Sequence, residues 1–253
     1  MKVAFIIPFH NEEKNCKPMI ERVVYFGKKE KLNFMVVPVN DRSSDRTGKI
    51  LKEMAKKYKK HVFPVIRADN GDEKGNTMGK ALVEGTRKAR ADIIIWTMGD
   101  MADDTKSYKD IIKMLKKGYD MVFGSRYMPG GSRGNLDRLK AFLSSWGTRL
   151  GRLLFGVPVH DITNAFRGFK KGVFNGIRLD CSGFSISPEF AIKAHLAGFR
   201  LGEVPTVYTN RVEGVSNFKL YKMSKSYLDL YRDLFYRYKI MRRPLDFNRR
   251  MKN

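Results

Sequence analysis

The amino-acid sequence predicts an α/β fold with a Rossmann-like, mostly parallel sheet flanked by helices. In the first half of the chain, short apolar runs of strand length alternate with stretches whose apolar residues recur at helical spacing. Polar or acidic residues directly follow three of these runs. In a parallel sheet such residues meet at the carboxyl edge, which is where open α/β folds bind their ligands.

The predicted elements follow one another at regular intervals. Strands are expected at the apolar runs 3–8, 34–39, 62–66, 93–96 and 121–123. A helix is expected after each of the first three strands, on stretches that include residues 19–24, 50–54 and 80–89. Strands and helices that alternate in this way are joined by right-handed crossovers, so the sheet is expected to be largely parallel.

The composition indicates a folded protein whose positive charge favours binding to polyanions. A chain of 253 residues with 42% hydrophobic residues has room for one large α/β domain with extensions. The formal net charge of +24 favours nucleic acid, anionic lipid headgroups or phosphorylated substrates as partners. The sequence has no helix-turn-helix, zinc-finger or RNP-like signature, so we expect no specific nucleic-acid partner.

Cysteine usage and hydropathy bear on the compartment. Cys16 and Cys181 lie far apart and fit no metal-binding spacing, which favours a reducing compartment. The first apolar run stops at Pro8, too soon for a signal peptide. No apolar run approaches the roughly 18 residues of a spanning helix. We therefore expect a cytoplasmic protein, peripheral on the cytoplasmic face of a membrane.

The clearest chemical signal follows the apolar run 93–96. Gly99 is followed within five residues by three carboxylates, Asp100, Asp103 and Asp104. Oxygen ligands at this spacing suit Mg²⁺ or Mn²⁺, hard cations that bridge to phosphate oxygens. The alternative is a polar turn in which Asp103 or Asp104 caps the next segment. Because the chain has no GxGxxG fingerprint after its first strand and no Walker sequence, hydride transfer and P-loop hydrolysis are disfavoured.

Six motifs, in this order over roughly residues 3–220, resemble those of family 2 glycosyltransferases, which have the GT-A fold. Two are similar to the strand-end signatures of the family, Ile6–Glu13 and Val39–Thr47. Four resemble the dolichol-phosphate mannosyltransferase branch: Phe123–Gly131, Asp161–Arg167, Glu203–Pro205, and Arg211 with Gly214 and Ser216. The metal motif departs from the usual Asp-x-Asp, because Met98 takes the first position. A chain that has lost metal binding would be a binding-only homologue.

The resemblance implies an inverting transfer of a hexose, of the mannose or glucose type, from a GDP- or UDP-sugar to a polyprenyl or dolichyl phosphate. An Arg suits the diphosphate because its planar fork donates two parallel hydrogen bonds. The expected catalytic residues are Asp100, Arg126, Arg211 and Lys219. The metal, Mg²⁺ or Mn²⁺, is expected on Asp100 and Asp103.

Two further sets of residues are expected to hold the substrates. The nucleotide is expected at Pro8, Asn11, Glu12, Asn40 and Asp41. For the last three of these, turn stabilisation is the alternative role. The phosphate of the acceptor is expected at Arg126, Arg138, Ser144 and Ser145, with Lys140 as the alternative to Arg138.

The nature of the acceptor depends on whether a general base is present. A hydroxyl acceptor needs such a base within hydrogen-bond reach, whereas a phosphate is already an anionic nucleophile. The four histidines show no spacing that suggests a proton relay. A phosphate acceptor is therefore favoured. The alternative is a hydroxyl acceptor in polysaccharide or glycolipid synthesis, with Asp161 or Glu189 as the base.

Two amphipathic stretches complete the chain, 136–155 and 217–253. We divide the chain into a GT-A domain, 1–216, and a basic helical tail, 217–253. Residues 211–253 contain twelve Lys or Arg against four Asp or Glu, a net charge of +8, interleaved with aromatic residues at helical spacing. Such a helix fits an anionic membrane surface. The alternative is packing against the catalytic domain or a partner subunit. The oligomeric state stays open.

Overall fold

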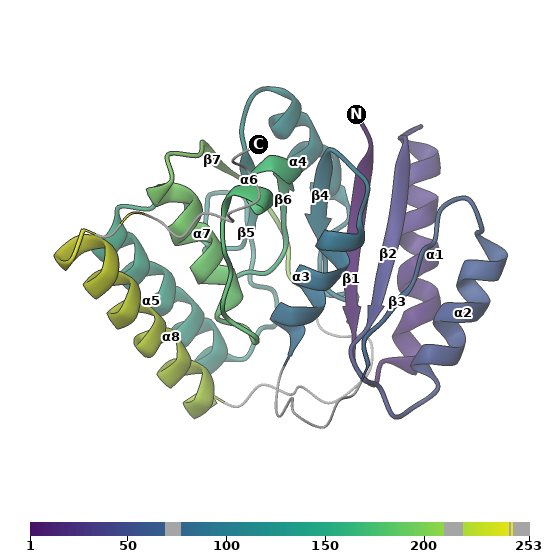
Figure 1. Ribbon diagram of the computed structural model, residues 1–253, viewed down its shortest axis with the longest axis horizontal. Helices are drawn as coiled ribbons and strands as arrows, with labels where there is room; N and C mark the ends of the chain where they lie inside the picture. Colours follow the sequence, from purple (N-terminus) through teal and green to yellow (C-terminus); the bar gives the residue numbers. More distant parts are fainter. Residues whose placement is uncertain (69–76, 210–219, 243, 245–253) are drawn as a thin grey trace.

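The computed structural model describes residues 1–68, 77–209, 220–242 and 244. It is built around one seven-stranded sheet in the order β3-β2-β1-β4-β6-β5-β7 (Figure 1). Helices cover both faces of this sheet, so the predicted α/β class is confirmed. The strands are β1 (Val3–Phe9), β2 (Phe34–Asn40), β3 (Val65–Ile66), β4 (Ile93–Trp96), β5 (Met121–Ser125), β6 (Arg167–Lys170) and β7 (Leu201–Pro205).

The sheet is parallel except for one inserted strand. β1 pairs in parallel with β2 and β4, β2 with β3, and β5 with β7. β6 runs antiparallel between β4 and β5. The carboxyl ends of β1, β2 and β4 therefore lie at one edge, and β6 separates that group from β5.

The helices divide between the two faces of the sheet. They are α1 (Glu13–Lys29), α2 (Thr47–Lys57), α3 (Met78–Lys88), α4 (Lys106–Lys116), α5 (Arg138–Phe155), α6 (Lys171–Gly176), α7 (Ile186–Leu196), α8 (Leu220–Leu234) and the π-helix η1 (Phe235–Ile240). α1, α2 and α4 share a core with Phe5 and Ile7 of β1, while α3, α6, α7 and α8 share a core with Ala4 and Ile6. The alternation of side chains along β1 supplies both cores.

The structure corrects the third predicted strand. Of the run 62–66, only Val65 and Ile66 join the sheet, and Val62 makes an isolated bridge to Val36. Phe63 and Ile66 are exposed, so little of the chain covers this edge of the sheet. A strand of β-type residues at the rim of a sheet needs only a few ladder hydrogen bonds, and its composition does not show where pairing stops.

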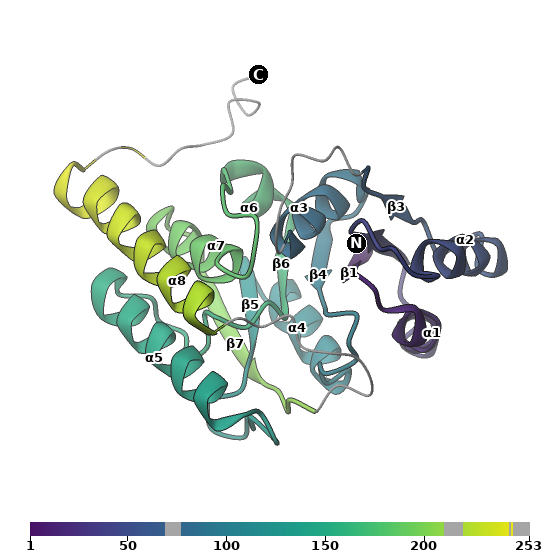
Figure 2. The same cartoon turned by 90° about the horizontal axis from the view of Figure 1, so that it is seen from below.

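α5 and α8 lie side by side at one end of the molecule (Figure 2). The two helices approach closely because α5 turns its small residues inward. A Cβ atom on Gly147 would lie 3.1 Å from the ring of Tyr227, and one on Gly151 would lie 2.5 Å from Ile162. The hydroxyl of Tyr231 donates a hydrogen bond to the carbonyl of Gly147 over 2.8 Å.

Several large apolar residues of α5 point away from the core, whereas Phe155 at its end is buried. Four of them are exposed: Leu139, Phe142, Trp146 and Leu153. In contrast, the aromatic and leucine residues that the tail was expected to present to a membrane include three that pack inward: Tyr227, Tyr231 and Leu234. The expected boundary between residues 216 and 217 lies outside the described residues, and the division into domain and tail stays a prediction.

Candidate active site

Polar residues from two strand ends meet at the carboxyl edge of the sheet. β1 and β2 pair up to Phe9 and Asn40, and the amide of Asp41 donates to the carbonyl of Phe9 over 2.7 Å. Pro8 is buried in β1, one residue before this point. The loops that follow these two strands are thus held together, as the sequence predicts for parallel neighbours.

Side-chain hydrogen bonds fasten the two loops to each other. Asn11, whose φ is +53°, accepts a hydrogen bond from the amide of Ser44 over 2.8 Å. The amide of Ser43 donates to Oδ1 of Asn40 over 3.1 Å, and the amide of Glu12 donates to Oγ1 of Thr47 over 3.0 Å. Asn11 and Asn40 therefore stabilise turns in the structure, which is the alternative role that the sequence left open for Asn40.

Asp41 lies in a buried cluster that the sequence did not reveal. Its carboxylate accepts hydrogen bonds from the hydroxyl of Thr77, over 2.9 and 2.8 Å, and from Arg67. Nε of Arg42 lies 3.6 Å from Oδ1 of Asp41. Arg67 and Thr77 stand 26 and 36 residues further along the chain, so no local motif links them to Asp41. The cluster sets a carboxylate and two guanidinium groups beside the expected nucleotide position.

The carboxylates after β4 are packed tightly against β1. A Cβ atom on Gly99 would lie 2.5 Å from the ring of Phe9 and 2.7 Å from the carbonyl of Pro8, so only glycine permits this approach. Asp100 and Asp103 are both buried behind it, with exposed fractions of 8% and 6%. The turn therefore holds two acidic side chains at the carboxyl edge.

Asp103 is held by two hydrogen bonds to one of its oxygens. Oδ2 accepts from the hydroxyl of Thr97 over 3.0 Å and from the amide of Met98 over 2.8 Å. Burial raises the pKa of Asp103 to about 7, and the negative charge of Asp100 adds to the effect.

This donor set fits a divalent cation. Hard oxygen ligands in a buried, acidic site are what Mg²⁺ and Mn²⁺ require. The described part of the chain contains no group of three or more His, Cys, Asp or Glu side chains that could hold a metal. Asp100 and Asp103 would therefore share the ion with oxygens from a diphosphate or from water.

Arg126 forms the centre of a second polar cluster, after β5. Its guanidinium binds Asp161 with two parallel hydrogen bonds, Nε to Oδ2 over 2.7 Å and Nη2 to Oδ1 over 3.0 Å. Nη2 also donates to Oγ of Ser144 over 2.9 Å. Burial alone would lower the pKa of Arg126, but the charge of Asp161 outweighs it and raises the pKa above its usual range. Among the described residues, none accepts a hydrogen bond from Nη1 of Arg126.

The residues predicted for the acceptor phosphate separate in the structure. Arg126 and Ser144 are in direct contact, and Ser144 is 7% exposed. Ser145 is half-buried, and Arg138 is exposed at the start of α5. The side chain of Lys140 and the predicted catalytic residues Arg211 and Lys219 lie outside the described residues.

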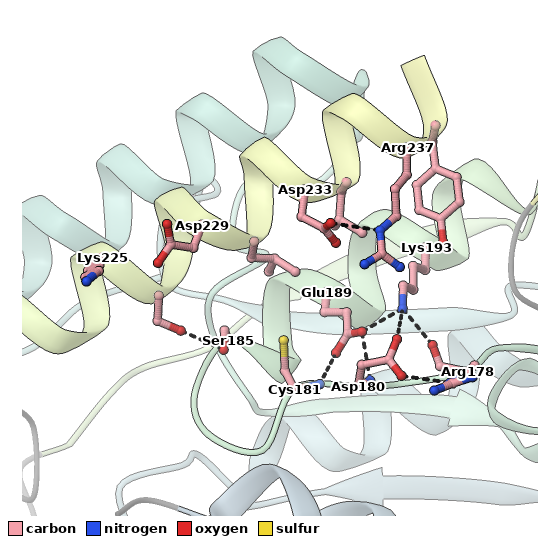
Figure 3. A pocket seen from close by; sticks show the side chains of 14 residues that line it. Arg178, Asp180, Cys181, Ser185, Glu189, Lys193, Lys225, Asp229, Asp233 and Arg237 are labelled. Atoms are coloured by element: carbon pink, nitrogen blue, oxygen red, sulfur yellow. Dashed lines mark hydrogen bonds and ion pairs between the residues drawn. The ribbon is translucent and has the colours of Figure 1, made fainter. Parts of the chain in front are cut away.

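The two carboxylates considered as bases are both committed to ion pairs. Asp161 is fully buried against Arg126. Glu189 is buried on α7, where it pairs with Nζ of Lys193 over 2.7 Å and accepts from the amides of Asp180 and Cys181, both over 2.9 Å (Figure 3). It lines a cavity of about 870 Å³ between α7 and α8. One further acid–base pair is present, since Nδ1 of His160 bonds Glu203 of β7.

Comparisons with known proteins agree with this geometry. The sequence profile described as "Glycosyl transferase family 2" matches residues 4–178. A dolichol-phosphate mannosyltransferase of Pyrococcus furiosus is 30% identical over 222 residues, 87% of this chain and 60% of that protein. The chain thus spans less than two thirds of this relative. A polyprenol monophosphomannose synthase of Mycolicibacterium smegmatis is 27% identical over 85% of this chain and 80% of its own length.

Solved structures show the same fold at much lower identity. Glucosyl-3-phosphoglycerate synthase from Mycobacterium tuberculosis, in complex with Mn²⁺, UDP and glucosyl-3-phosphoglycerate, superimposes with a TM-score of 0.68. The match covers 92% of this chain and 79% of that one at 11% identity, so it supports the fold alone and confirms the GT-A prediction. The profile match covers well over half of the sequence, and with it the predicted family is confirmed: this chain belongs to glycosyl transferase family 2.

Proposed function

We propose that this protein transfers a hexose from a GDP- or UDP-sugar to a polyprenyl or dolichyl phosphate, with inversion at the sugar carbon. The names of the two curated relatives, a dolichol-phosphate mannosyltransferase and a polyprenol monophosphomannose synthase, support a lipid-phosphate acceptor and a mannosyl donor. Inversion follows from a single displacement, in which the acceptor oxygen attacks the face of the sugar opposite the departing diphosphate.

The choice of a phosphate acceptor over a hydroxyl acceptor depends on one observation: Asp161 and Glu189, the two candidate bases, are each engaged in an ion pair with a basic side chain. A hydroxyl acceptor needs a base that is free to take a proton, and both carboxylates are buried in ion pairs with Arg126 and Lys193. A phosphate monoester needs no base, because its oxygen is already anionic near neutral pH. It needs a cationic donor, which Nη1 of Arg126 and the hydroxyl of Ser144 would supply together.

On the donor side, Asp100 and Asp103 would hold Mg²⁺ or Mn²⁺. A bound cation would neutralise the charge that grows on the nucleoside diphosphate as the sugar leaves. Asn11, Asn40 and Asp41 stand at the neighbouring strand ends and would border the nucleotide. Asp103 would complete the carboxylate pair that Met98 interrupts. In this reading the altered metal motif is compensated by Asp103.

We also propose that the exposed apolar face of α5 lies against the cytoplasmic face of a membrane. Within the described ranges, no helix has both the length and the apolar character that crossing a membrane requires. Four exposed apolar residues of α5, accompanied by Arg138 and Arg149, fit the interface of an anionic bilayer. This face, rather than the inward-packed aromatic residues of α8, would bring the acceptor's phosphate to Arg126.

Vesicle binding tests the membrane proposal. Phe142→Ser is expected to weaken binding to vesicles of anionic phospholipid about fivefold, because one exposed aromatic side chain no longer enters the interface. Tyr25→Ser is the matched control, since Tyr25 is equally exposed but lies on α1, far from α5. Equal binding of both variants to the vesicles would contradict the proposal that the apolar face of α5 contacts the membrane.

The reaction is tested with a panel of radiolabelled GDP- and UDP-sugars. Each donor is incubated with the protein, polyprenyl phosphate, detergent and Mg²⁺ or Mn²⁺. Label that enters the organic phase as an acid-labile product from one donor would establish the reaction and the donor together. Label that reaches only water-soluble or glycolipid hydroxyl acceptors would overturn the lipid-phosphate acceptor.

Two specific features favour second candidates, and each has its own readout. The pair formed by His160 and Glu203 favours a hydroxyl acceptor, because an imidazole beside a carboxylate is a competent base. Loss of all transfer in His160→Ala would support that candidate. Met98 favours a binding-only homologue, for which nucleotide binding would persist without transfer and without a metal requirement.

A further inference from the structure

Arg167 is a fully buried arginine at the first position of β6. Within the described residues, its guanidinium donates to backbone carbonyls alone: from Nη1 to Ser187 over 2.8 Å, and from Nη2 to Ile162 over 3.2 Å and to Asn164. No carboxylate of the described chain lies within ion-pair distance of it. A buried cation without a paired anion is costly, so a role beyond packing is expected.

The position of Arg167 links it to the cluster around Arg126. Ile162 and Asn164 belong to the short turn that begins at Asp161, and this turn supplies both oxygens that bind Arg126. Arg167 therefore holds the backbone of the same turn whose carboxylate binds Arg126. Its guanidinium also lies 4.6 Å from the centre of the Phe123 ring on β5, the strand that leads to Arg126.

The charges of this cluster do not balance. Arg126 and Arg167 are both buried, and the charge of Asp161 acts on both of them, while Asp103 in the neighbouring acidic turn acts on Arg126. Burial lowers the pKa of Arg167 to about 9, so Arg167 still carries its charge at neutral pH. Taken by themselves, Arg126, Arg167 and Asp161 carry an excess of one positive charge, beside the hydroxyl of Ser144 and the Nη1 of Arg126, for which the described residues supply no acceptor. An anionic ligand at that point would balance it.

We propose that Arg167 is a positioning residue of the acceptor site: it fixes the turn 161–164 behind Arg126 and supplies the buried positive charge that the acceptor's phosphate neutralises. This inference rests on the proposed function, because it takes a phosphate as the acceptor's reacting group. It adds a residue that makes no contact with the acceptor but sets how strongly Arg126 attracts an anion.

The test separates the phosphate of the ligand from its hydrocarbon. Farnesyl phosphate and farnesol serve as the two probes, and the ratio of their dissociation constants measures what the phosphate contributes. Arg167→Gln is expected to reduce this ratio about tenfold, since a favourable interaction with a charged group is lost. Arg167→Lys keeps the charge but not the fork of donors, and is expected to retain most of the ratio.

Phe169→Leu is the matched control for loosening of the strand. Phe169 stands two residues further along β6, is fully buried, and packs edge-on against Trp96 with the ring centres 5.2 Å apart. Its replacement disturbs the same strand without changing any charge. The ratio for Phe169→Leu is expected to stay within about twofold of the original, although its melting temperature falls.

Kinetics with the short-chain phosphate provide a second readout. Arg167→Gln is expected to raise KM for farnesyl phosphate and leave KM for the sugar nucleotide nearly unchanged. Equal losses of affinity for farnesyl phosphate and farnesol, or equal effects of Arg167→Gln and Phe169→Leu, would reduce Arg167 to a packing residue. If Arg167→Gln does not fold, Arg167→Met decides, because it also removes the charge: the proposal predicts a selective loss of affinity for farnesyl phosphate, whereas a purely structural role predicts equal changes for farnesyl phosphate and farnesol.

Failure of the inference differs from failure of the proposed function. Transfer of label to polyprenyl phosphate by the original protein, with an unchanged phosphate-to-alcohol ratio in Arg167→Gln, would overturn only the role of Arg167. Absence of any preference for farnesyl phosphate over farnesol in the original protein would overturn both.

Discussion

Two buried polar clusters of opposite charge lie at the ends of β4 and β5, the two strands that flank β6, and the second includes Arg167 of β6 itself. At the end of β4, Asp100 and Asp103 place two carboxylates together, and Asp103 accepts its hydrogen bonds from a hydroxyl and an amide. After β5, Arg126 and Arg167 share Asp161. An unbalanced buried charge is expensive, so each cluster indicates a ligand of the opposite sign. The first suits a cation with its diphosphate, and the second suits a phosphate.

Removal of the first carboxylate is expected to have the largest effect. Asp100→Asn keeps the shape of the side chain but removes its charge, and we expect transfer to fall at least about a thousandfold, because the leaving diphosphate loses its cation. The measurement is initial transfer rate at saturating Mn²⁺, with circular dichroism as the check on folding. Activity close to that of the original protein would remove Asp100 from the metal site.

A change at Arg126 is expected to have the next largest effect. Arg126→Ala removes the donor from the positive cluster and leaves Asp161 without its partner, so kcat/KM for the acceptor is expected to fall about a hundredfold. Binding of the nucleotide, measured by calorimetry with GDP and UDP, is expected to change much less. A selective loss of nucleotide affinity would move Arg126 from the acceptor to the donor.

Two adjacent serines, Ser144 and Ser145, test whether the acceptor binds beside Arg126. Ser144→Ala is expected to raise KM for the acceptor about fivefold, because its hydroxyl is within 2.9 Å of Arg126. Ser145→Ala, with the same chemical change one residue away, is expected to be nearly silent. A larger effect at Ser145 would mean that the other face of this turn of α5 binds the acceptor.

The cluster formed by Asp100 and Asp103 is expected to make the stability of the folded protein depend on pH. The pKa of Asp103 rises from 3.8 to about 7 on folding, so between these values the folded chain binds more protons than the unfolded one. Stability from this group is complete below about pH 4 and is lost as the pH rises to about 7. Melting temperatures in chelator are expected to show this component, and Asp103→Asn is expected to lack it. Identical pH profiles would contradict the assignment.

The sequence predicted the first part of the sheet well because its strands are unbroken apolar runs. β1, β2 and β4 are buried on both faces, and such strands consist of consecutive apolar residues. β6 escaped prediction because Arg167, Gly168 and Lys170 interrupt any such run. The carbonyls of Ile162, Asn164 and Ser187 make an arginine acceptable there, and a sequence does not show which carbonyls converge.

The site could be predicted as a location but not as a set of contacts. Asp100 follows its strand directly, so its place at the carboxyl edge followed from the alternation of elements. Apart from Arg42, which adjoins Asp41, the partners described for Arg126 and Asp41 lie 18 to 37 residues away in sequence, and no local pattern pairs them. Periodicity also identified α5 as amphipathic without showing which face is buried. Gly147 and Gly151 decide this, because α8 and Ile162 pack where they have no side chains.

The outward-facing residues of α5 also give the protein a built-in optical reporter. The chain has two tryptophans. Trp96 is fully buried and donates its indole hydrogen to Thr86 over 2.8 Å, so its emission is fixed by the core. Trp146 is 39% exposed on the apolar face of α5. A shift of the fluorescence spectrum toward the blue on addition of vesicles would therefore arise from one known side chain, without any label attached to the protein.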